Sequence, residues 1–390
     1  MNNTTHTDAL IIGAGPAGIS TALHLLQTNP NWAGRMAIVD KATHPREKLC
    51  GGGVTRSGEA VLTRLGLPFE PEHIFVKELR FVYRGSVYTL YDDPVFRITR
   101  RADFDHWLAQ QAEKRGARLY QGEAVTDLIP HRDGVEVVTQ KRTFYAKSVV
   151  VADGSNSFAR KKLKWPGGKH KARLLEVLTP ETIQNSPAHQ NGAAVFDFSA
   201  LPENLQGYYW DFPSLIKGQA MMNRGVFDSR SAAARPRAAL KDVLRRSMAA
   251  RGRYLEEVPL KGYPIHCFDP RGQLAMPRII LAGDAAGVDP LVGEGIAFAL
   301  QYGAAAAAAL SDAFQRNDFS FNTYKPRVQR DPLLGRLNTR VKLARLIYGF
   351  KYKWQFDIAW KLLPALVQFL AWYAPESMPF ESPKLVKSQT

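Results

Sequence analysis

The stretch that decides the fold reads Ala-Leu-Ile-Ile-Gly-Ala-Gly-Pro-Ala-Gly and occupies residues 9–18. Its four leading apolar residues predict a short β-strand, and the apolar spacing of residues 19–27 predicts a helix directly after the glycines. Residues 36–39 predict a second strand, which has Asp40 at its end. A strand, a glycine-rich turn, a helix and a second strand with a terminal acid make up the βαβ unit of a dinucleotide site. The first part of the chain is therefore expected to bind a dinucleotide.

Each glycine of this turn has its own expected task. Gly13 allows the tight turn, Gly15 lets a pyrophosphate approach the backbone, and Gly18 lets the helix pack closely on the strand. The helix start offers free N–H groups and a partial positive charge to the phosphates, while Asp40 is placed to accept a hydrogen bond from a ribose hydroxyl. A glycine-rich turn without any ligand is the alternative, but the strand, the helix and the distal acid together favour the dinucleotide.

Composition limits the class of protein. The chain has 390 residues, which is long for one hydrophobic core, so two domains or one domain with an appendage are expected. Its 45% hydrophobic and 23% charged residues exclude disordered, collagen-like and disulfide-scaffold proteins. Two cysteines, Cys50 and Cys267, suit a reducing compartment. The polar first residues and the lack of an apolar run of about 18 residues predict neither a signal peptide nor a transmembrane helix, and the expected location is cytoplasmic.

The net charge points to the kind of partner. A formal charge of +16 indicates an anionic cofactor, an anionic membrane surface or nucleic acid, but no nucleic-acid-binding motif accompanies it, so nucleic acid is not expected. Residues 321–390 hold 12 Lys and Arg against 4 Asp and Glu, and aromatic residues alternate with lysines at residues 348–373. This pattern is typical of peripheral attachment to a membrane, with Trp354, Trp360 and Trp372 at the headgroups. A helical cap over the substrate cavity is the alternative, and the two are compatible.

Nucleotide-type motifs recur along the chain and alternate with β-rich material. Asp153-Gly154 and Gly283-Asp284 each follow a short apolar run, as ordinary strand-end turns also do. Asp284 is more specific, because it precedes a glycine-rich stretch that opens an alanine-rich helix from Ile296. We therefore predict an α/β protein with a Rossmann-like dinucleotide-binding domain (residues 1–75, 99–165 and 276–320), an inserted β-rich substrate domain (residues 76–98 and 166–275) and a C-terminal helical segment (residues 321–390).

The order of these motifs gives the chain a family resemblance. The glycine turn, Asp153-Gly154 and Gly283-Asp284 together resemble the FAD-dependent family typified by para-hydroxybenzoate hydroxylase. Residues 45–53, Pro-Arg-Glu-Lys-Leu-Cys-Gly-Gly-Gly, resemble the flavin-edge loop of geranylgeranyl reductases within that superfamily. Residues 208–213, Tyr-Tyr-Trp-Asp-Phe-Pro, match their Tyr-x-Trp-x-Phe-Pro signature, and residues 293–296, Gly-Glu-Gly-Ile, match their flavin-contacting turn. The resemblance covers about residues 8–320.

This resemblance implies non-covalent FAD, no metal, and reduction of isolated C=C bonds in the prenyl chain of a lipid or isoprenoid. The external electron donor, NAD(P)H or a ferredoxin-type protein, stays open. Asp211 and Ser214 depart from the family pattern beside the signature, and Val151 departs from the hydroxylase pattern. The implied cofactor contacts are Gly13, Gly15, Ala17, Gly18, Asp40, Cys50, Gly51, Gly53, Arg101, Val125, Asp153, Gly154, Asp284, Gly293, Gly295 and Ile296.

Cys50 opens the glycine run and is a predicted catalytic residue, together with Trp210. Three consecutive glycines lose much conformational entropy on ordering, which is reasonable where a backbone must lie flat against a ring. Arg46 and Lys48 give the Cys50 thiol positive neighbours, so it could deliver a proton or line the hydride face. Packing as a small buried hydrophobe is the alternative, and it is the expected role of Cys267.

Aromatic side chains are concentrated at residues 208–213. A lipid chain needs an apolar slot that excludes water, and aromatic rings supply rigid contact surface. A core strand of the inserted domain would show the same composition. The predicted substrate contacts are Tyr208, Trp210, Phe212 and Pro213.

Two other functions stay open from the sequence. An oxygen-using flavin enzyme, either a monooxygenase or a halogenase, would share the fold, and fold alone does not separate these activities. The Trp-x-Trp-x-Ile-Pro pattern expected of halogenases is absent, which favours the reductase. A non-catalytic basic protein that binds membrane or nucleic acid would hold no flavin, so the colour of the purified protein would distinguish it.

Overall fold

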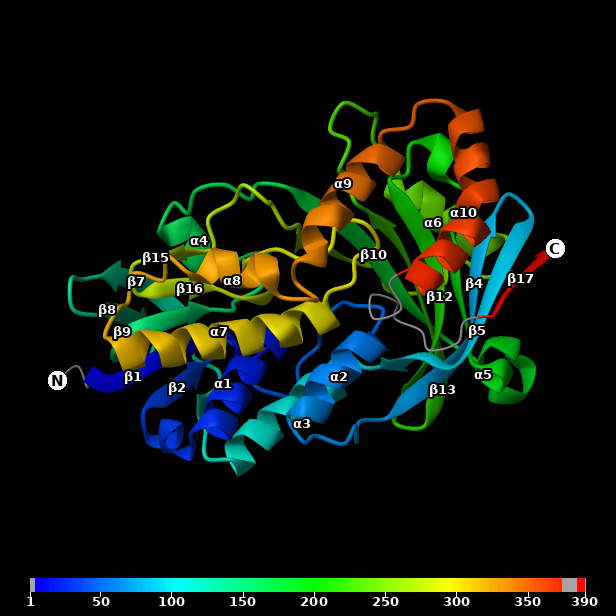
Figure 1. The fold of residues 1–390 in the computed structure, drawn as a ribbon. Helices are drawn as coiled ribbons and strands as arrows, with labels where there is room; N and C mark the ends of the chain where they lie inside the picture. The colour runs from blue at the N-terminus through cyan, green and yellow to red at the C-terminus, as the bar shows by residue number, and fades with distance from the viewer. Residues whose placement is uncertain (1–3, 374–383, 390) are drawn as a thin grey trace.

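The computed structural model describes residues 4–373 and 384–389. Two β-sheets form the two ends of an elongated molecule, and helices cover them (Figure 1). The first sheet contains the N-terminal strand. The second sheet contains the long strands, and the C-terminal strand pairs at its edge. The space between the sheets is where the sequence motifs from distant parts of the chain meet.

The first sheet has eight strands and is built around β1 (Thr4–Ile12). β1 pairs in parallel with β2 (Met36–Val39) and β9 (Thr143–Val151), and the parallel order continues to β6 (Arg118–Tyr120) and β16 (Ile279–Leu281). Parallel strands end at the same edge of a sheet, so the segments after β1, β9 and β16 come together there. Antiparallel strands complete the sheet: β7 (Val125–Pro130), β8 (Val135–Thr139) and β15 (Ala275–Met276).

Helices α1 (Pro16–Thr28) and α7 (Ile296–Arg316) pack against each other on this sheet (Figure 1). Their backbones approach closely, because a Cβ on Gly303 would lie 2.5 Å from the Ser20 side chain, whose Oγ donates to Leu300 O at 2.7 Å. Among the described residues α7 alone has the length and apolar composition to cross a membrane, and 72% of its most apolar window is buried inside the protein. The remaining helices around this sheet are α2 (Arg56–Arg64), α3 (Arg101–Lys114) and α4 (Phe158–Lys162).

The second sheet has nine strands in the order β14-β10-β13-β12-β11-β4-β5-β17, with β3 also paired to β5. All of its pairings are antiparallel except that of β4 with β11. Short helices α5 (Pro187–Asn191) and α6 (Leu240–Ala249) pack beside it. The strands are β3 (Gly53–Thr55), β4 (His73–Tyr83), β5 (Ser86–Thr99), β10 (Lys171–Pro180), β11 (Ala193–Asp197), β12 (Gly207–Ile216), β13 (Gln219–Asp228), β14 (Lys261–His266) and β17 (Lys384–Gln389).

The alternation of side chains along β12 sorts the aromatic stretch onto two faces. Successive residues of a strand point to opposite sides of the sheet. Tyr208, Trp210 and Phe212 therefore share one apolar cluster on the inner face, which looks toward the first sheet. Tyr209 points the other way and packs with Val226 beside α6.

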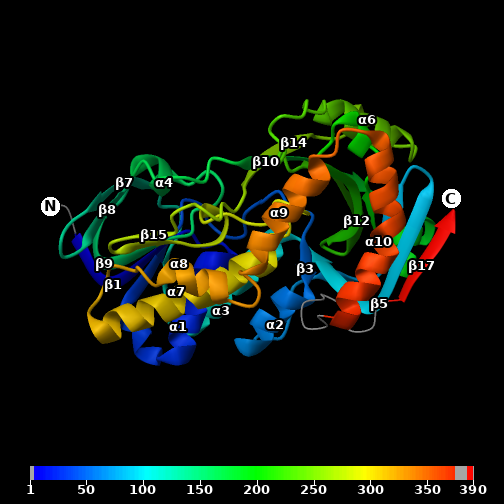
Figure 2. The ribbon, with the colours of Figure 1, turned by 45° about the horizontal axis from the view of Figure 1, so that its top comes forward.

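The C-terminal part contributes three helices and one strand. Helix α8 (Tyr324–Arg330) follows α7, α9 (Arg336–Tyr348) leads from the first sheet toward the second, and α10 (Lys353–Tyr373) lies beside β5 (Figure 2). The expected helices are confirmed, but the strand β17 is not part of the prediction. β17 pairs with residues 86–91 of the long strand β5, whose open edge would otherwise leave backbone groups unpaired.

Candidate active site

One cavity of about 690 Å³ lies between the two sheets and contains most of the predicted site residues. Gly18 and Pro213 are not in its lining: Gly18 packs α1 on the glycine turn, and Pro213 lies in β12 opposite Met222. The cavity brings together residues from all parts of the chain that carry motifs. The predicted residues that line it are Gly13, Gly15, Ala17, Asp40, Cys50, Gly51, Gly53, Arg101, Val125, Asp153, Gly154, Tyr208, Trp210, Phe212, Asp284, Gly293, Gly295 and Ile296.

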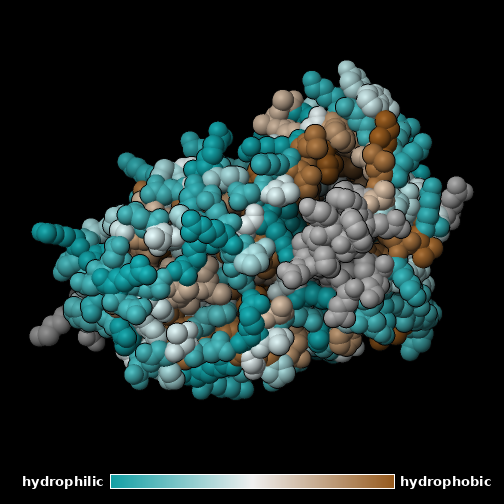
Figure 3. All heavy atoms as spheres, viewed as in Figure 1, coloured by the Kyte–Doolittle hydropathy of each residue, from teal (hydrophilic) through white to brown (hydrophobic). Residues whose placement is uncertain are grey.

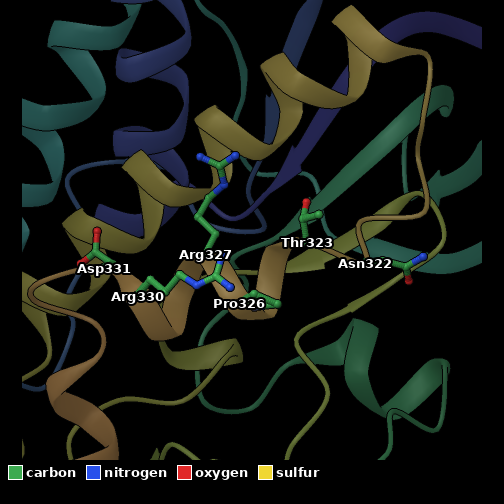
Figure 4. A pocket seen from close by; sticks show the side chains of 6 residues that line it. All are labelled: Asn322, Thr323, Pro326, Arg327, Arg330 and Asp331. Atoms are coloured by element: carbon green, nitrogen blue, oxygen red, sulfur yellow. The ribbon is translucent and has the colours of Figure 1, made fainter.

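A second pocket lies on the surface at α8 (Figure 4). Arg327 turns toward α7, where it pairs with Asp312. None of the predicted site residues belongs to this lining, so the cavity between the sheets is the candidate active site. The lining residues of the second pocket are Asn322, Thr323, Pro326, Arg327, Arg330 and Asp331.

The turn at the start of α1 is shaped by its three glycines. Gly13 has a φ of +109°, and a Cβ there would lie 2.3 Å from Ala152 O, so a side chain cannot fit. A Cβ on Gly18 would lie 1.9 Å from Gly13 O, so Gly18 is required for the close packing of α1 on the turn, and its predicted cofactor contact stays a prediction. A Cβ on Gly15 would instead meet only Arg46 Nη2, at 3.5 Å. The chain thus leaves room at Gly15, and this room opens into the cavity.

Asp40 is fixed at the end of β2 by two backbone N–H groups. Ala14 N donates to Asp40 Oδ2 at 2.6 Å, and Ala42 N donates to Oδ1 at 2.8 Å. Ala14 belongs to the glycine turn, so the Asp40 carboxylate braces this turn as well as facing the cavity. A carboxylate has about four acceptor positions, which leaves capacity for a ribose hydroxyl.

Arg46 and Arg101 line the end of the cavity that contains the glycine turn, and they share the buried carboxylate of Asp105. Arg101 donates to Asp105 through Nε at 2.7 Å and Nη2 at 2.8 Å, and Arg46 Nη2 lies 3.1 Å from Asp105 Oδ2. Burial alone would lower the pKa of Arg101, but the Asp105 carboxylate raises it, so the guanidinium keeps its charge. Two guanidiniums against one carboxylate leave a net positive charge, which suits a pyrophosphate. Sequence reasoning assigned Arg46 only to the surroundings of Cys50.

Asp153 carries a buried oxygen that has no partner within the described chain. Its Oδ2 accepts from Ala159 N at 3.1 Å, whereas Oδ1 is buried and unpaired. Burial raises the pKa of Asp153. A buried unpaired acceptor is costly, so this oxygen fits a donor group on a ligand in the cavity. With the open side of Gly15 and the two arginines, it makes the residues present compatible with a bound dinucleotide.

Lys48 is a further cation of the lining. Its ammonium lies 3.5 Å from the centroid of the Tyr263 ring. Burial lowers the pKa of Lys48 to about 8, although Asp284 opposes this shift. An ammonium that is costly to bury suits a neighbouring anion in the bound state.

The loop at residues 50–53 lies tightly against the second sheet. Gly52 has a φ of +79°, and a Cβ on it would lie 2.0 Å from Thr99 O. A Cβ on Gly51 would lie 2.8 Å from Cε2 of Phe212. Gly51 and Gly52 are therefore required by the close approach of the loop to the sheet, in addition to any ring that binds on the cavity side.

Cys50 is held through its carbonyl oxygen and its sulfur. Asn223 Nδ2 donates to Cys50 O at 3.1 Å, and Gly52 N points to Cys50 Sγ at 3.4 Å. Asn223 Oδ1 in turn accepts from Trp210 Nε1 at 2.8 Å. The Cys50 side chain is half-buried in the cavity wall, which leaves the thiol accessible to a molecule in the cavity.

The glycine turn before α7 is held by an ion-pair network that reaches it from α9. Arg340 Nη1 lies 2.7 Å from Asp289 Oδ2, and Arg340 Nη2 lies 3.0 Å from Glu294 Oε2. Thr55 Oγ1 donates to Glu294 Oε1 at 2.7 Å, which ties the turn to the end of β3. Asp289 is completely buried. Residues 293–296 are thus positioned by the C-terminal region, and sequence reasoning missed Arg340, because no local motif surrounds it.

Aromatic rings line the other end of the cavity. The Phe196 ring lies 4.7 Å from that of Tyr208 and 5.1 Å from that of Phe212, measured between centroids. Tyr208 OH donates to Val292 O at 2.5 Å, and the Trp210 N–H is used by Asn223. Tyr208 and Trp210 therefore offer the cavity their rings, which suits a hydrocarbon chain. The catalytic role of Trp210 stays a prediction.

No protein-family model matches the chain. Among curated proteins, menaquinone reductase from Mycolicibacterium smegmatis is 30% identical over 328 residues, which span 78% of this chain and 76% of the relative. Digeranylgeranylglycerophospholipid reductase from Methanocaldococcus jannaschii is 27% identical over 337 residues, which span 82% of this chain and 80% of the relative.

Solved structures share the fold. A geranylgeranyl bacteriochlorophyll reductase-like protein from Thermoplasma acidophilum matches with a TM-score of 0.72 and 21% identity, over 89% of this chain and 88% of its own. Halogenase PltM in complex with phloroglucinol and FAD matches with a TM-score of 0.67 and 16% identity, over 88% of this chain and 76% of its own. The predicted fold class is confirmed by both likenesses.

Proposed function

Because the chain belongs to the geranylgeranyl reductase family of FAD-dependent oxidoreductases, we propose that it saturates C=C bonds in the prenyl chain of a lipid or isoprenoid. The observation that best supports this proposal is that one cavity is lined by the dinucleotide turn, the Cys50 loop and the aromatic side chains. A prenyl chain among the aromatic rings would present a double bond beside Cys50. The relative named for digeranylgeranylglycerophospholipid supports this class of substrate.

FAD is the cofactor of this family, and we assign its parts to the residues that fit them. The pyrophosphate would lie at Gly15 and the start of α1, which has no side-chain cap, within reach of Arg46 and Arg101. Asp40 would accept from the ribose. The loop at residues 50–53 and the turn before Ile296 would hold the isoalloxazine ring. When bound, FAD supplies the two electrons that reduction of a C=C bond requires.

Cys50 is the proposed proton donor. An isolated alkene has no carbonyl group to absorb negative charge, so a proton must reach one carbon together with the hydride or before it. The Cys50 thiol is half-buried in the wall that faces both the dinucleotide turn and the aromatic rings. Tyr208, Trp210 and Phe212 would orient the chain and exclude water.

We also propose how the chain divides into domains. Residues 1–75, 99–165 and 276–320 would form the FAD-binding domain. Residues 76–98 and 166–275 would form the substrate domain. Residues 321–390 would form the C-terminal helical segment, whose helix α9 contributes Arg340 to the cavity lining.

An oxygen-using flavin enzyme is the second candidate, because halogenase PltM has the same fold. The Cys-Gly-Gly-Gly loop at residues 50–53 and the absence of the halogenase pattern favour the reductase. A decisive experiment reduces the yellow protein with dithionite under nitrogen and adds a lipid that bears a geranylgeranyl chain. Mass spectrometry should show two added hydrogen atoms per saturated bond, with no need for oxygen or halide. An unchanged lipid under nitrogen, combined with hydroxylated or halogenated product in air, would overturn the proposal.

The Gly15→Val variant is the matched control for this experiment. The chain leaves room for a Cβ at Gly15, so the variant should fold, but its side chain would occupy the space of the pyrophosphate. It should therefore be colourless and inactive in the same assay.

We further propose that α9 and α10 dock on an anionic membrane surface, from which the lipid substrate would enter. Figure 3 shows apolar surface in this region. Exposed lysines lie among the apolar side chains, as in helices that bind anionic lipid. The exposed large apolar residues are Leu343, Leu346, Tyr352, Trp354, Ile358 and Leu362, and the lysines are Lys342, Lys351, Lys353 and Lys361.

Trp360 does not belong to this surface, which corrects the sequence-based expectation. Its ring lies 5.4 Å from that of Tyr83 and 5.3 Å from that of Tyr88, and its Nε1 donates to Ser86 Oγ at 3.1 Å. Trp360 therefore packs α10 onto the second sheet. The side chain of Trp372 lies outside the described residues.

Vesicle binding tests the membrane proposal. Each lysine near an anionic surface contributes about 1 kcal/mol, so replacing Lys351, Lys353 and Lys361 by glutamine should weaken binding to anionic vesicles up to roughly 100-fold at low salt. The control replaces the exposed residues Lys161, Lys162 and Lys164 by glutamine, which should have little effect. If the intact protein ignores anionic vesicles at low salt, α9 and α10 are only a cap over the cavity.

A further inference from the structure

Glu176 is a carboxyl group enclosed in the inner face of the second sheet. It lies in β10 between Gly225 of β13 and Lys261 of β14, and it is only 4% exposed. Leu174, which points to the same side two residues earlier, lines the cavity. The Trp210 ring lies over Gly225, where a Cβ would be 2.3 Å from the ring. An acidic residue in such an apolar row is unusual and calls for a reason beyond packing.

This carboxyl lies directly behind the Cys50 loop. The backbone N–H of Cys50 and the side-chain amide of Asn223 both face it. The same amide donates to Cys50 O, and Trp210 donates to Asn223 Oδ1. Glu176, Asn223 and Trp210 thus form a polar layer beneath the loop. Oε2 of Glu176 is buried without a hydrogen-bond partner in the described chain, so the carboxyl has capacity that the fold does not use.

The charges around Glu176 do not hold it in the ionised form. Arg100, at the start of α3, is engaged by Glu47 at 2.7 Å, and Lys261 lies at the exposed edge of β14. Burial raises the pKa of Glu176 to about 7, although Arg100, the Cys50 N–H, Asn223 and Lys261 act in the opposite direction. Glu176 therefore gains and loses its proton close to neutral pH, beside the backbone of a loop whose thiol lines the cavity.

We propose that Glu176 is the proton store of the Cys50 loop, a role that rests on the proposed reduction. The Cys50 S–H bond breaks as its proton forms a C–H bond on one alkene carbon, while the other carbon receives the hydride. The Glu176 O–H bond then breaks, and its proton re-forms the S–H bond. Water reprotonates Glu176 before the next turnover. The net reaction adds a hydride, drawn from reduced FAD, and a proton, drawn from water, to the double bond.

Glu176 acts through Cys50 and is thus a positioning residue, so its test must separate proton supply from packing. The Glu176→Gln variant keeps the size and the hydrogen-bonding groups but carries no titratable proton. The wild-type turnover rate should fall as pH rises above about 7, because Glu176 is then ionised. The turnover rate of the variant should lack this fall. At pH 6 the variant should turn over about tenfold more slowly than wild type, which is a smaller loss than removal of a direct general acid causes. Glu176→Asp should restore part of the rate and its pH dependence.

A second readout needs no substrate and therefore separates this inference from the proposed function. Iodoacetamide alkylates thiolates, and an ionised Glu176 beside Cys50 disfavours the thiolate. At pH 8 the FAD-loaded Glu176→Gln protein should be alkylated at Cys50 faster than wild type, by about fivefold, the order of effect expected when one nearby negative charge is removed. Glu203→Gln, at an exposed ion pair, is the control and should match wild type.

The combination of outcomes is decisive. Faster alkylation with an altered pH–rate profile supports the proton store. Alkylation and turnover profiles that match wild type in Glu176→Gln would make Glu176 a packing residue and overturn the inference. If Glu176→Gln does not fold, Glu176→Asp must still move the pH dependence of alkylation, and an unmoved profile overturns it equally. If no prenyl lipid is reduced by wild type, the proposed function fails, while alkylation still decides whether Glu176 and Cys50 are coupled.

Discussion

Replacing Arg340 by methionine should release much of the bound FAD and lower the free energy of unfolding by about 3–5 kcal/mol. Methionine keeps the length of the side chain but removes the charge that Asp289 and Glu294 share, at 2.7 Å and 3.0 Å. Asp289 is completely buried, so its carboxylate would lose its ion-pair partner in a low-dielectric site and would keep the hydrogen bonds from three backbone N–H groups. The turn at residues 293–296 would then lose its anchor. Urea unfolding and flavin fluorescence measure the two effects.

Arg345→Met is the matched control, because Arg345 lies on the same helix α9 but is exposed. It should leave both the urea midpoint and the FAD affinity close to wild type, as surface substitutions usually do. The double variant Arg340→Met, Asp289→Asn should recover part of the stability, because it removes the unpaired charge. Unchanged FAD affinity in a folded Arg340→Met protein would show that α9 covers the cavity without positioning the turn.

What the sequence could predict here rests on short-range chemistry. The glycine turn with Asp40 lies within one βαβ unit, and the Tyr-x-Trp-x-Phe-Pro match covers six consecutive residues. Parallel pairing then brings the ends of β1, β9 and β16 to one edge, which is why motifs distant in sequence share one cavity. These features follow from local patterns plus one topological rule.

The residues that sequence reasoning missed act over long separations. Arg340 is 51 positions from Asp289, and nothing around it differs from an ordinary basic helix. Glu176 becomes unusual only when β10 places it behind a loop that lies more than a hundred residues earlier. The strand β17 depends on the open edge of β5, which no local pattern reveals. In each case the role depends on a contact with a residue or strand far away in the sequence, and the local sequence does not reveal that contact.

Replacing Cys50 by alanine should reduce turnover by about 10²–10⁴-fold, the usual loss when a general acid is removed, and should leave FAD binding intact. The side chain is half-buried at the edge of the main core, its Sγ accepts one weak hydrogen bond from Gly52 N at 3.4 Å, and Asn223 holds the residue through its carbonyl oxygen. Alanine therefore removes the proton while the loop keeps its place against the sheet. Anaerobic single-turnover rates of the reduced enzyme with a prenyl lipid measure the effect, and flavin absorbance checks cofactor content.

Cys267→Ala separates loss of a proton donor from loss of a thiol in general. Cys267 is completely buried in the apolar cluster of the second sheet, and burial raises the pKa of its thiol to about 12, so it cannot exchange its proton readily near neutral pH. Its replacement should cost some stability through the space that the sulfur fills, with a turnover rate near that of wild type. Cys50→Ser replaces the S–H group by an O–H group, which is similar in size but less acidic. The turnover rate of this variant should therefore fall between those of Cys50→Ala and wild type. A Cys50→Ala enzyme with full FAD and undiminished turnover would make Cys50 a packing residue, and water would then be the immediate proton donor to the alkene.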